Sequence, residues 1–347
     1  MNAVAETRTH SAAEPHSTHK LKLLLKREFW EHKGGFFWAP LVAGGISLLL
    51  TILGIIFGEI TARRAMADGK LKFDDGVVIN GLDLGALTGR LGPEEMSKLG
   101  HGIDLSLFVA SSWPFIVLGF VVFFYCLGAL YDDRKDRSVL FWKSLPISDR
   151  DTVVSKVLSA LLVAPILALA ASLVTMVGFM LVLSAVVLLH GGNPFTLLWS
   201  PGSPLSVVSA FMIGIPVYAL WALPTAGWLL LCSAWARSKP FLWAIMIPVF
   251  SGIFVSWFDL TRLFNLDSSW YWKHIVGRML LGTFPGTDLL YQDDFGKGVG
   301  DVAGSLHQIS AATALHSLAM PELWIGAAAG LAMIFGAIRL RRWRDEG

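Results

Sequence analysis

The sequence predicts an all-α, polytopic membrane protein whose chain crosses the bilayer six times. Only 16% of the 347 residues are charged, whereas soluble proteins carry about 25%. The apolar residues gather in long runs that contain almost no charge, and about 20 such residues form a helix long enough to cross the hydrocarbon core. The predicted spans cover residues 36–57, 108–131, 153–189, 205–232, 241–258 and 322–340.

The third run, 153–189, is longer than one bilayer crossing needs, because about 20 helical residues already cover 30 Å. We therefore expect its first turns, which contain Lys156, to project from the membrane into water. Cys126 and Cys232 lie inside apolar runs, which predicts buried free thiols and no disulfide framework.

The distribution of Lys and Arg predicts the orientation of the chain. The short loop 190–204 contains neither residue, whereas basic residues precede the first span, separate the second from the third and the fourth from the fifth, and close the chain. By the positive-inside rule both termini face the cytoplasm, and segments 58–107 and 259–321 lie outside. Residues 1–20 lack the apolar core of a signal peptide and are predicted to be a disordered cytoplasmic tail.

Residues 21–35 are predicted to form an amphipathic helix in the lipid headgroup plane before the first span. Leucines recur at helical spacing on one side and cations occupy the other, while Gly34 and Gly35 allow a sharp turn into the membrane. The alternative is a plain continuation of the first span towards the cytosol. The candidate residues of this helix are Lys22, Lys26, Arg27, Phe29 and Trp30.

The stretch between the second and third spans holds ten charged residues from Asp132 to Asp151, five acidic and five basic. Pro146 ends a short helix there, and Ser148 with Asp151 predicts a capped restart. Mixed charge beside the apolar run 139–142 suits docking to a mixed-charge protein surface. A solvated loop with an aromatic anchor is the alternative interpretation.

The external segment 259–321 contains apolar pieces too short to span, which predicts interfacial or partly re-entrant helices or, alternatively, a separate external domain. Gly54 with Gly58, and Gly326 with Gly330, permit close helix approach, either within the chain or between two copies. Tryptophans of the fourth and fifth spans fit interfacial belts or the lining of a substrate path, for which Trp221 and Trp228 are the candidates.

Several kinds of chemistry lack their signatures in this chain. There is no G-x-x-x-x-G-K-[ST] phosphate loop, no H-E-x-x-H and no G-x-S-x-G. The spans have no ionisable residue near their centres, which disfavours an ion-coupled carrier. The net charge of +2 gives no reason to expect nucleic acid, and the nine histidines are scattered, so no metal site is predicted.

The segment "YDDRKDRSVLFWKSLPISDRDTVVSKVL", together with the helix before the first span and the six spans, resembles the permease subunits of type-2 ABC exporters. The motif covers about thirty residues, and its matching positions are Asp133, Arg134, Ser138, Leu145, Pro146, Ile147, Ser148 and Lys156. Glutamate is commoner than aspartate at the position of Asp133 in that family. The rest of the likeness is one of topology.

The resemblance implies a six-helix half-transporter with an elbow helix, a coupling helix between spans two and three, and short extracellular helices before the last span. It implies two copies of a separate P-loop ATPase, which binds the ATP and Mg. It also implies a second permease in the bacterial cytoplasmic membrane, either another copy of this chain in a homodimer or a similar subunit. This chain itself would bind no cofactor, and it would move an amphiphilic lipid, peptide or drug-like substrate outward. The residues implied in coupling are Asp132, Asp133, Arg134, Lys135, Asp136, Arg137, Phe141, Trp142, Lys143 and Pro146.

Two other functions remain open from the residues alone. A membrane enzyme acting on lipid-linked substrates would draw on Asp293, Asp294 and His274. A non-transporting scaffold or sensor would use the charged segment 132–151 to hold a cytosolic partner.

Overall fold

The computed structural model describes residues 17–67, 92–136, 148–261, 267–291 and 311–344, and all regular structure within these ranges is helical. Six helical stretches are long and apolar enough to cross a membrane, which confirms the six predicted spans and the membrane class. They are Gly34–Ala65, Pro93–Lys135, Asp149–Leu189, Pro204–Trp235, Pro240–Leu260 and Pro321–Trp343.

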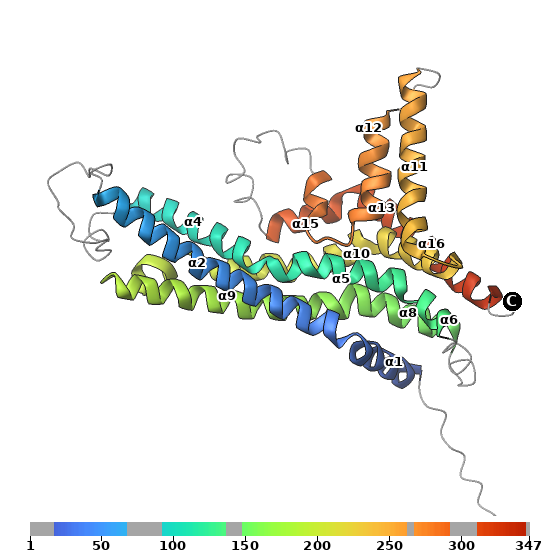
Figure 1. Cartoon of the computed structure of the whole chain (residues 1–347), viewed down its shortest axis with the longest axis horizontal. Coiled ribbons are helices and arrows are strands. Elements are labelled where there is room, and N and C mark those ends of the chain that lie inside the picture. Colours follow the sequence, from blue (N-terminus) through green and yellow to red (C-terminus); the bar gives the residue numbers. More distant parts are fainter. Residues whose placement is uncertain (1–16, 68–91, 137–147, 262–266, 292–310, 345–347) are drawn as a thin grey trace, which may run out of the picture.

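A bundle of long helices forms the body of the molecule (Figure 1). It contains α2 (Ala39–Ala67), α4 (Pro93–Ser111), α5 (Trp113–Gly128), α9 (Ala164–Leu189) and α10 (Pro204–Trp235). The third span runs without interruption through α8 (Asp149–Leu158) and the π-helical turn η2 (Ser159–Val163) into α9, 41 residues in all. At 1.5 Å per residue this is about 60 Å, about twice the thickness of a bilayer core, as the length of the apolar run predicts.

The last span, α16 (Pro321–Arg344), packs along α10 through glycines. A Cβ on Gly227 would lie 2.5 Å from the carbonyl oxygen of Gly330, and a Cβ on Gly330 would lie 2.5 Å from the carbonyl carbon of Leu223. Only glycine permits this approach of two backbones. The predicted close contact through Gly330 is therefore made within the chain, whereas Gly54 and Gly58 face open space.

The fifth span, α11 (Pro240–Leu260), stands across the long axis of the bundle, beside α12 (Ser268–Tyr271) (Figure 1). The chain then returns to the bundle through η4 (Trp272–Gly277) and α13 (Arg278–Leu281). It contacts the middle of α10, where Thr225 donates a hydrogen bond to the carbonyl of Arg278 and Tyr218 donates one to the carbonyl of Thr283. The short helices expected in segment 259–321 are thus present, with η5 (Thr287–Tyr291) and α15 (Ala311–Ala319) completing them.

The N-terminal helix, α1 (Ser17–Glu31), begins a few residues before position 21 and packs against α8 and η2. The predicted sharp turn at Gly34 and Gly35 is wrong, because both glycines lie in a π-helical turn, η1 (Gly34–Trp38), that leads directly into α2. Backbone hydrogen bonds from His32 to Glu28 and from Phe36 to His32 keep the chain helical through this junction. Gly35 packs closely on α5, where a Cβ on this residue would lie 3.1 Å from a side-chain methyl group of Val121.

Candidate functional site

The helix α1, the end of α16 and the helices that flank segment 137–147 lie at one end of the bundle, next to the last turns of α10 (Figure 1). We call this the basic end, after Lys135, Lys156, Arg237, Lys239 and Arg341. The short helix α6 (Tyr131–Lys135) precedes segment 137–147, and α8 follows it. Ser148 caps α8 by accepting a hydrogen bond from the backbone N–H of Asp151 at 3.1 Å, which confirms the predicted cap.

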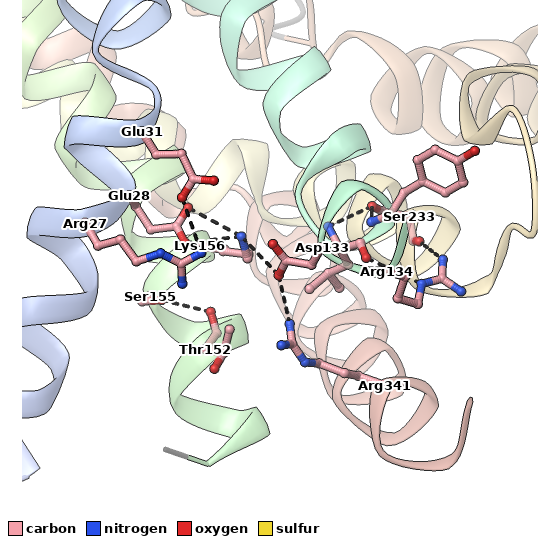
Figure 2. Close-up of polar contacts among 12 residues, drawn as sticks. Arg27, Glu28, Glu31, Asp133, Arg134, Thr152, Ser155, Lys156, Ser233 and Arg341 are labelled. Atoms are coloured by element: carbon pink, nitrogen blue, oxygen red, sulfur yellow. Dashed lines mark hydrogen bonds and ion pairs between the residues drawn. The ribbon is translucent and has the colours of Figure 1, made fainter. Parts of the chain in front are cut away.

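A cluster of buried charges joins α1, α6, α8 and α16 at the basic end (Figure 2). The Nζ of Lys156 lies 3.1 Å from Oε1 of Glu28 and 3.5 Å from Oδ2 of Asp133. The guanidinium of Arg341 bridges two carboxylates: its Nη1 is 3.3 Å from Asp133 and its Nε is 3.3 Å from Asp149. We call Glu28, Asp133, Asp149, Lys156 and Arg341 the charge cluster.

The members of the charge cluster are withdrawn from solvent, apart from the half-buried Asp149. Glu28 is 0% exposed, Lys156 is 1%, Arg341 is 5% and Asp133 is 7%. Buried ions are tolerated only when opposite charges and hydrogen bonds replace the lost water. Here the signs alternate from Glu28 through Lys156, Asp133 and Arg341 to Asp149, so each cation lies between two carboxylates.

Tyr125 and His32 flank the Glu28 end of the charge cluster. The hydroxyl of Tyr125 donates a 2.7 Å hydrogen bond to Oε2 of Glu28. The half-buried His32 ring lies 4.0 Å from the same oxygen and meets the Tyr125 ring edge to face, with centroids 4.7 Å apart. The charge cluster itself contains three carboxylates and two cations.

The corner between α5 and α6 is fixed to the end of α10 by hydrogen bonds around Ser233. Its hydroxyl oxygen accepts from the backbone N–H groups of Leu130 at 3.0 Å and Tyr131 at 2.9 Å. Arg134 donates from its guanidinium to the carbonyls of Ser233 and Ala236. The start of α6 is therefore held by α10 as well as by the charge cluster.

The predicted location of Lys156 in water is wrong. Its ammonium group is buried because Glu28 and Asp133, which lie far from it in the sequence, close around it. A hydropathy window places a lysine at the edge of an apolar run, but it does not show which distant carboxylates will cover that edge. The recognised motif did contain both Asp133 and Lys156, yet nothing in it showed that the two pair.

The residues implied in coupling divide into three groups. Asp132, Lys135 and Asp136 are exposed at the end of α6. Asp133 points into the charge cluster and Arg134 towards α10, so both face this chain (Figure 2). The remaining candidates lie outside the described residues; they are Arg137, Phe141, Trp142, Lys143 and Pro146.

In α1 the candidates Lys22, Lys26 and Trp30 are exposed, while Arg27 and Phe29 are half-buried. Sequence reasoning missed Glu28, which is the buried acid of this helix. A signal for it existed: Glu28 follows Leu24 by four residues and therefore shares the face that packs inward. In the sequence, Arg341 stands out only as one of the basic residues that close the chain, and Asp149 only as one of the ten charged residues between positions 132 and 151.

The two tryptophans predicted to line a substrate path are both engaged in packing within the chain. Trp221 is 1% exposed, and the guanidinium carbon of Arg278 lies over the Trp221 ring, 4.1 Å from the ring centroid. Arg278 also donates to the carbonyls of Glu322 and Leu323 at the start of α16. Burial lowers the pKa of this guanidinium, although nearby Tyr291 and Glu322 oppose the shift. Trp228 donates from Nε1 to the carbonyl of Ala244 at 3.0 Å.

Of the three residues suggested for an enzyme, His274 alone lies within the described part of the chain. His274 stacks on Trp270 and hydrogen-bonds its carbonyl, while Asp293 and Asp294 lie outside the described residues. Within the described part of the chain, no group of three His, Cys, Asp or Glu side chains could hold a metal ion. Cys126 and Cys232 are free, buried thiols, as predicted.

No protein-family model, no curated protein and no solved structure matches the chain. Composition and fold establish a helical, multi-pass membrane protein. A more specific function has to be argued from the basic end.

Proposed function

We propose that this chain is the transmembrane permease subunit of an ABC transporter of the type-2 exporter kind. In this proposal it moves an amphiphilic substrate outward across a bacterial cytoplasmic membrane, with both termini in the cytoplasm. The energy comes from ATP, which two copies of a separate P-loop subunit hydrolyse with Mg. A second copy of the permease completes the transporter.

The charge cluster is the observation that supports the proposal most strongly. Arg341 contacts Asp133 on α6 and Asp149 on α8, so one side chain holds both flanks of segment 137–147. Lys156 then connects Asp133 to Glu28 on α1. Because α6 continues α5 and α8 continues into α9, a force applied to segment 137–147 is carried into two spans as one unit.

Exposed charges remain for a partner after the internal pairs are made. Lys135 and Asp136 are exposed at the end of α6 next to segment 137–147, Asp132 is exposed in its first turn, and none of these three takes part in the charge cluster. A mixed-charge surface of this kind suits a protein partner, because charge complementarity sets orientation and association rate. The proposed ATPase would dock here.

The direct test is co-purification of the full chain with a P-loop ATPase subunit, followed by transport in proteoliposomes. A triple reversal of Asp132→Lys, Lys135→Glu and Asp136→Lys should abolish the association while leaving the permease folded. Lys98→Glu is the matched control and should bind the ATPase normally, because Lys98 is exposed and belongs to α4, which lies towards the opposite end of the bundle from α6 (Figure 1). Equal binding by both variants would refute docking at α6.

A non-transporting scaffold would use the same surface, so binding alone does not separate it from a permease. ATP-dependent movement of an amphiphile by the reconstituted pair supports transport. A stable complex that hydrolyses ATP without moving any amphiphile and without any change in the spans would favour the scaffold.

A further inference from the structure

A groove separates the α1–η1 junction from α5 and has a volume of about 540 Å³. This is within the range of about 300–1,000 Å³ that small-molecule sites occupy. Glu31, His32 and Asp132 line one end, and Phe120, Val121 and Phe124 line the other. Apart from Asp132, its lining residues belong neither to the charge cluster nor to the exposed α6 residues proposed to dock the ATPase.

The groove changes from apolar to acidic along its length. Phe120, Phe124, Gly128 and Asp132 recur at every fourth position, which places them along one side of α5 and its continuation into α6. At 1.5 Å per residue, Phe120 and Gly128 lie about 12 Å apart along the helix. The acidic end of the groove lies at the basic end of the bundle, and its aromatic end lies further along α5. This order matches an amphiphile, whose polar headgroup would lie at the acidic end and whose apolar tail would lie along the aromatic residues.

The acidic end favours a cation over an anion. Among the described residues that line the groove there is no lysine or arginine, whereas Glu31 and Asp132 bring carboxylates. The carboxylate of Asp132 folds back along the helix, and its Oδ2 lies 2.5 Å from the place a Cβ on Gly128 would take. The negative charge of Glu31 is partly neutralised by the guanidinium of Arg27, 3.3 Å away, so Asp132 attracts a cation more strongly than Glu31 does.

We propose that this groove binds an amphiphile with a cationic ammonium headgroup, with the head at Asp132 and the tail along Phe120 and Phe124. That this ligand is cargo rests on the proposed function. The inner wall supports such a role, because Tyr125 lines the groove and donates its hydroxyl to Glu28. An occupant therefore touches a side chain that is bound directly to the charge cluster.

The experiment uses the full chain alone in nanodiscs and three amphiphiles with the same tetradecyl tail. A photoactivatable tetradecyltrimethylammonium probe is cross-linked, and labelled peptides are mapped by mass spectrometry. Labelling should concentrate in residues 31–36 and 120–132, and unlabelled tetradecyltrimethylammonium should compete it away. Tetradecyl sulfate and tetradecyl maltoside at the same concentration should compete at least about fivefold less well, the difference expected from one partly exposed ion pair.

Two matched pairs of variants locate the contacts. Gly34→Leu fills the groove from a position whose Cβ meets nothing within 4 Å, and it should abolish labelling, whereas Gly54→Leu, equally open but outside the groove, should not. Asp132→Asn should weaken competition by the cationic amphiphile about fivefold, and Asp136→Asn, also exposed on the same turn, should leave it unchanged.

Equal competition by all three amphiphiles would overturn the inference, and so would labelling that Gly34→Leu leaves in place. Neither outcome touches the proposed function, because no ATPase is present in the assay. Conversely, if no ATPase subunit co-purifies with the full, unaltered chain, the proposed function fails while this binding result stands, so failures of the two proposals are distinguishable.

Discussion

Lys156 illustrates at the scale of single residues why the charge cluster holds together. Its ammonium group is buried between two carboxylates from different helices, which compensates for the water it has lost. Such an arrangement contributes little net stability compared with an apolar core, yet removing one partner leaves an uncompensated buried charge. The same reasoning applies to Arg341, whose two carboxylate partners flank segment 137–147.

We therefore expect Lys156→Met to lower the free energy of unfolding by about 3–5 kcal/mol, since Glu28 loses its cation and Asp133 keeps only Arg341. The double variant Lys156→Met with Glu28→Gln should recover part of the loss. Thermal unfolding in one fixed detergent measures both. Lys98→Met is the matched control, because Lys98 forms an exposed pair with Glu94 at 2.7 Å and should change stability by about 1 kcal/mol at most. Equal losses at the two lysines would contradict the buried-pair argument.

Asp288 provides a pH prediction outside the spans. Burial raises the pKa of its carboxyl group, although hydrogen bonds from Ser317 and from backbone N–H groups work the other way. The folded state then holds the proton more tightly than the unfolded state, so this group's contribution to stability falls as pH rises from the unfolded pKa, about 4, through the higher folded pKa.

Asp288→Asn removes this dependence and keeps an acceptor for Ser317. The melting temperature of the variant should exceed that of the wild type at pH 7, and the difference should shrink as pH is lowered to about 4, where both states of Asp288 become protonated. Asp136→Asn, at an exposed carboxylate, should show no comparable gain. A gain for Asp288→Asn that grows towards low pH would reverse the sign we assign.

At the scale of helices, the sequence predicted what depends on local pattern. The six spans follow from runs of apolar residues, and the start of α8 follows from Ser148 and Asp151. The charge cluster could not be predicted in the same way, because Glu28, Asp133 and Arg341 come from distant helices and meet only after these pack. The turn at Gly34 and Gly35 was misjudged because glycine is compatible with both a sharp turn and a continuous helix, and the sequence alone does not show that the chain stays helical from α1 through η1 into α2.

The crossing of α10 and α16 gives a prediction for a pair of helices. In Gly330→Leu the new side chain would meet the backbone of Leu223 and Pro224, which cannot move aside as a flexible side chain can. We expect the two helices to separate, with a loss of about 1–3 kcal/mol in the free energy of unfolding. Gly58→Leu is the control, because a Cβ at Gly58 meets nothing within 4 Å. Thermal unfolding of the two variants side by side decides; an unchanged midpoint for Gly330→Leu would exclude this close contact.

At the scale of the whole molecule, charge and apolar surface are sorted along the bundle. Basic residues gather beside α1, α6, α8 and the end of α16, while the connection between α9 and α10 at the opposite end has none (Figure 1). Burial is uneven too: only 17% of the apolar window is buried in the first and fifth spans, against 50% in the second. The exposed apolar sides of α2 and α11 are the surfaces that would meet lipid or a second copy.

This sorting predicts the orientation of the chain in the membrane, and alkaline phosphatase fusions test it. The enzyme is active only outside the cytoplasm. A fusion after Gly192 ends in the loop without Lys or Arg and should be active, whereas a fusion after Ser238, between Arg237 and Lys239, should be inactive. A fusion after Gly347 should also be inactive, and green fluorescent protein at the same position should fluoresce. The fusions after Gly192 and after Ser238 differ by one span, α10, so their opposite activities would establish that this helix crosses the bilayer with its Trp235 end in the cytoplasm. The reverse pattern would place the charge cluster and segment 137–147 outside the cell, where no ATP-hydrolysing partner could reach them, and the proposed function would fail with it.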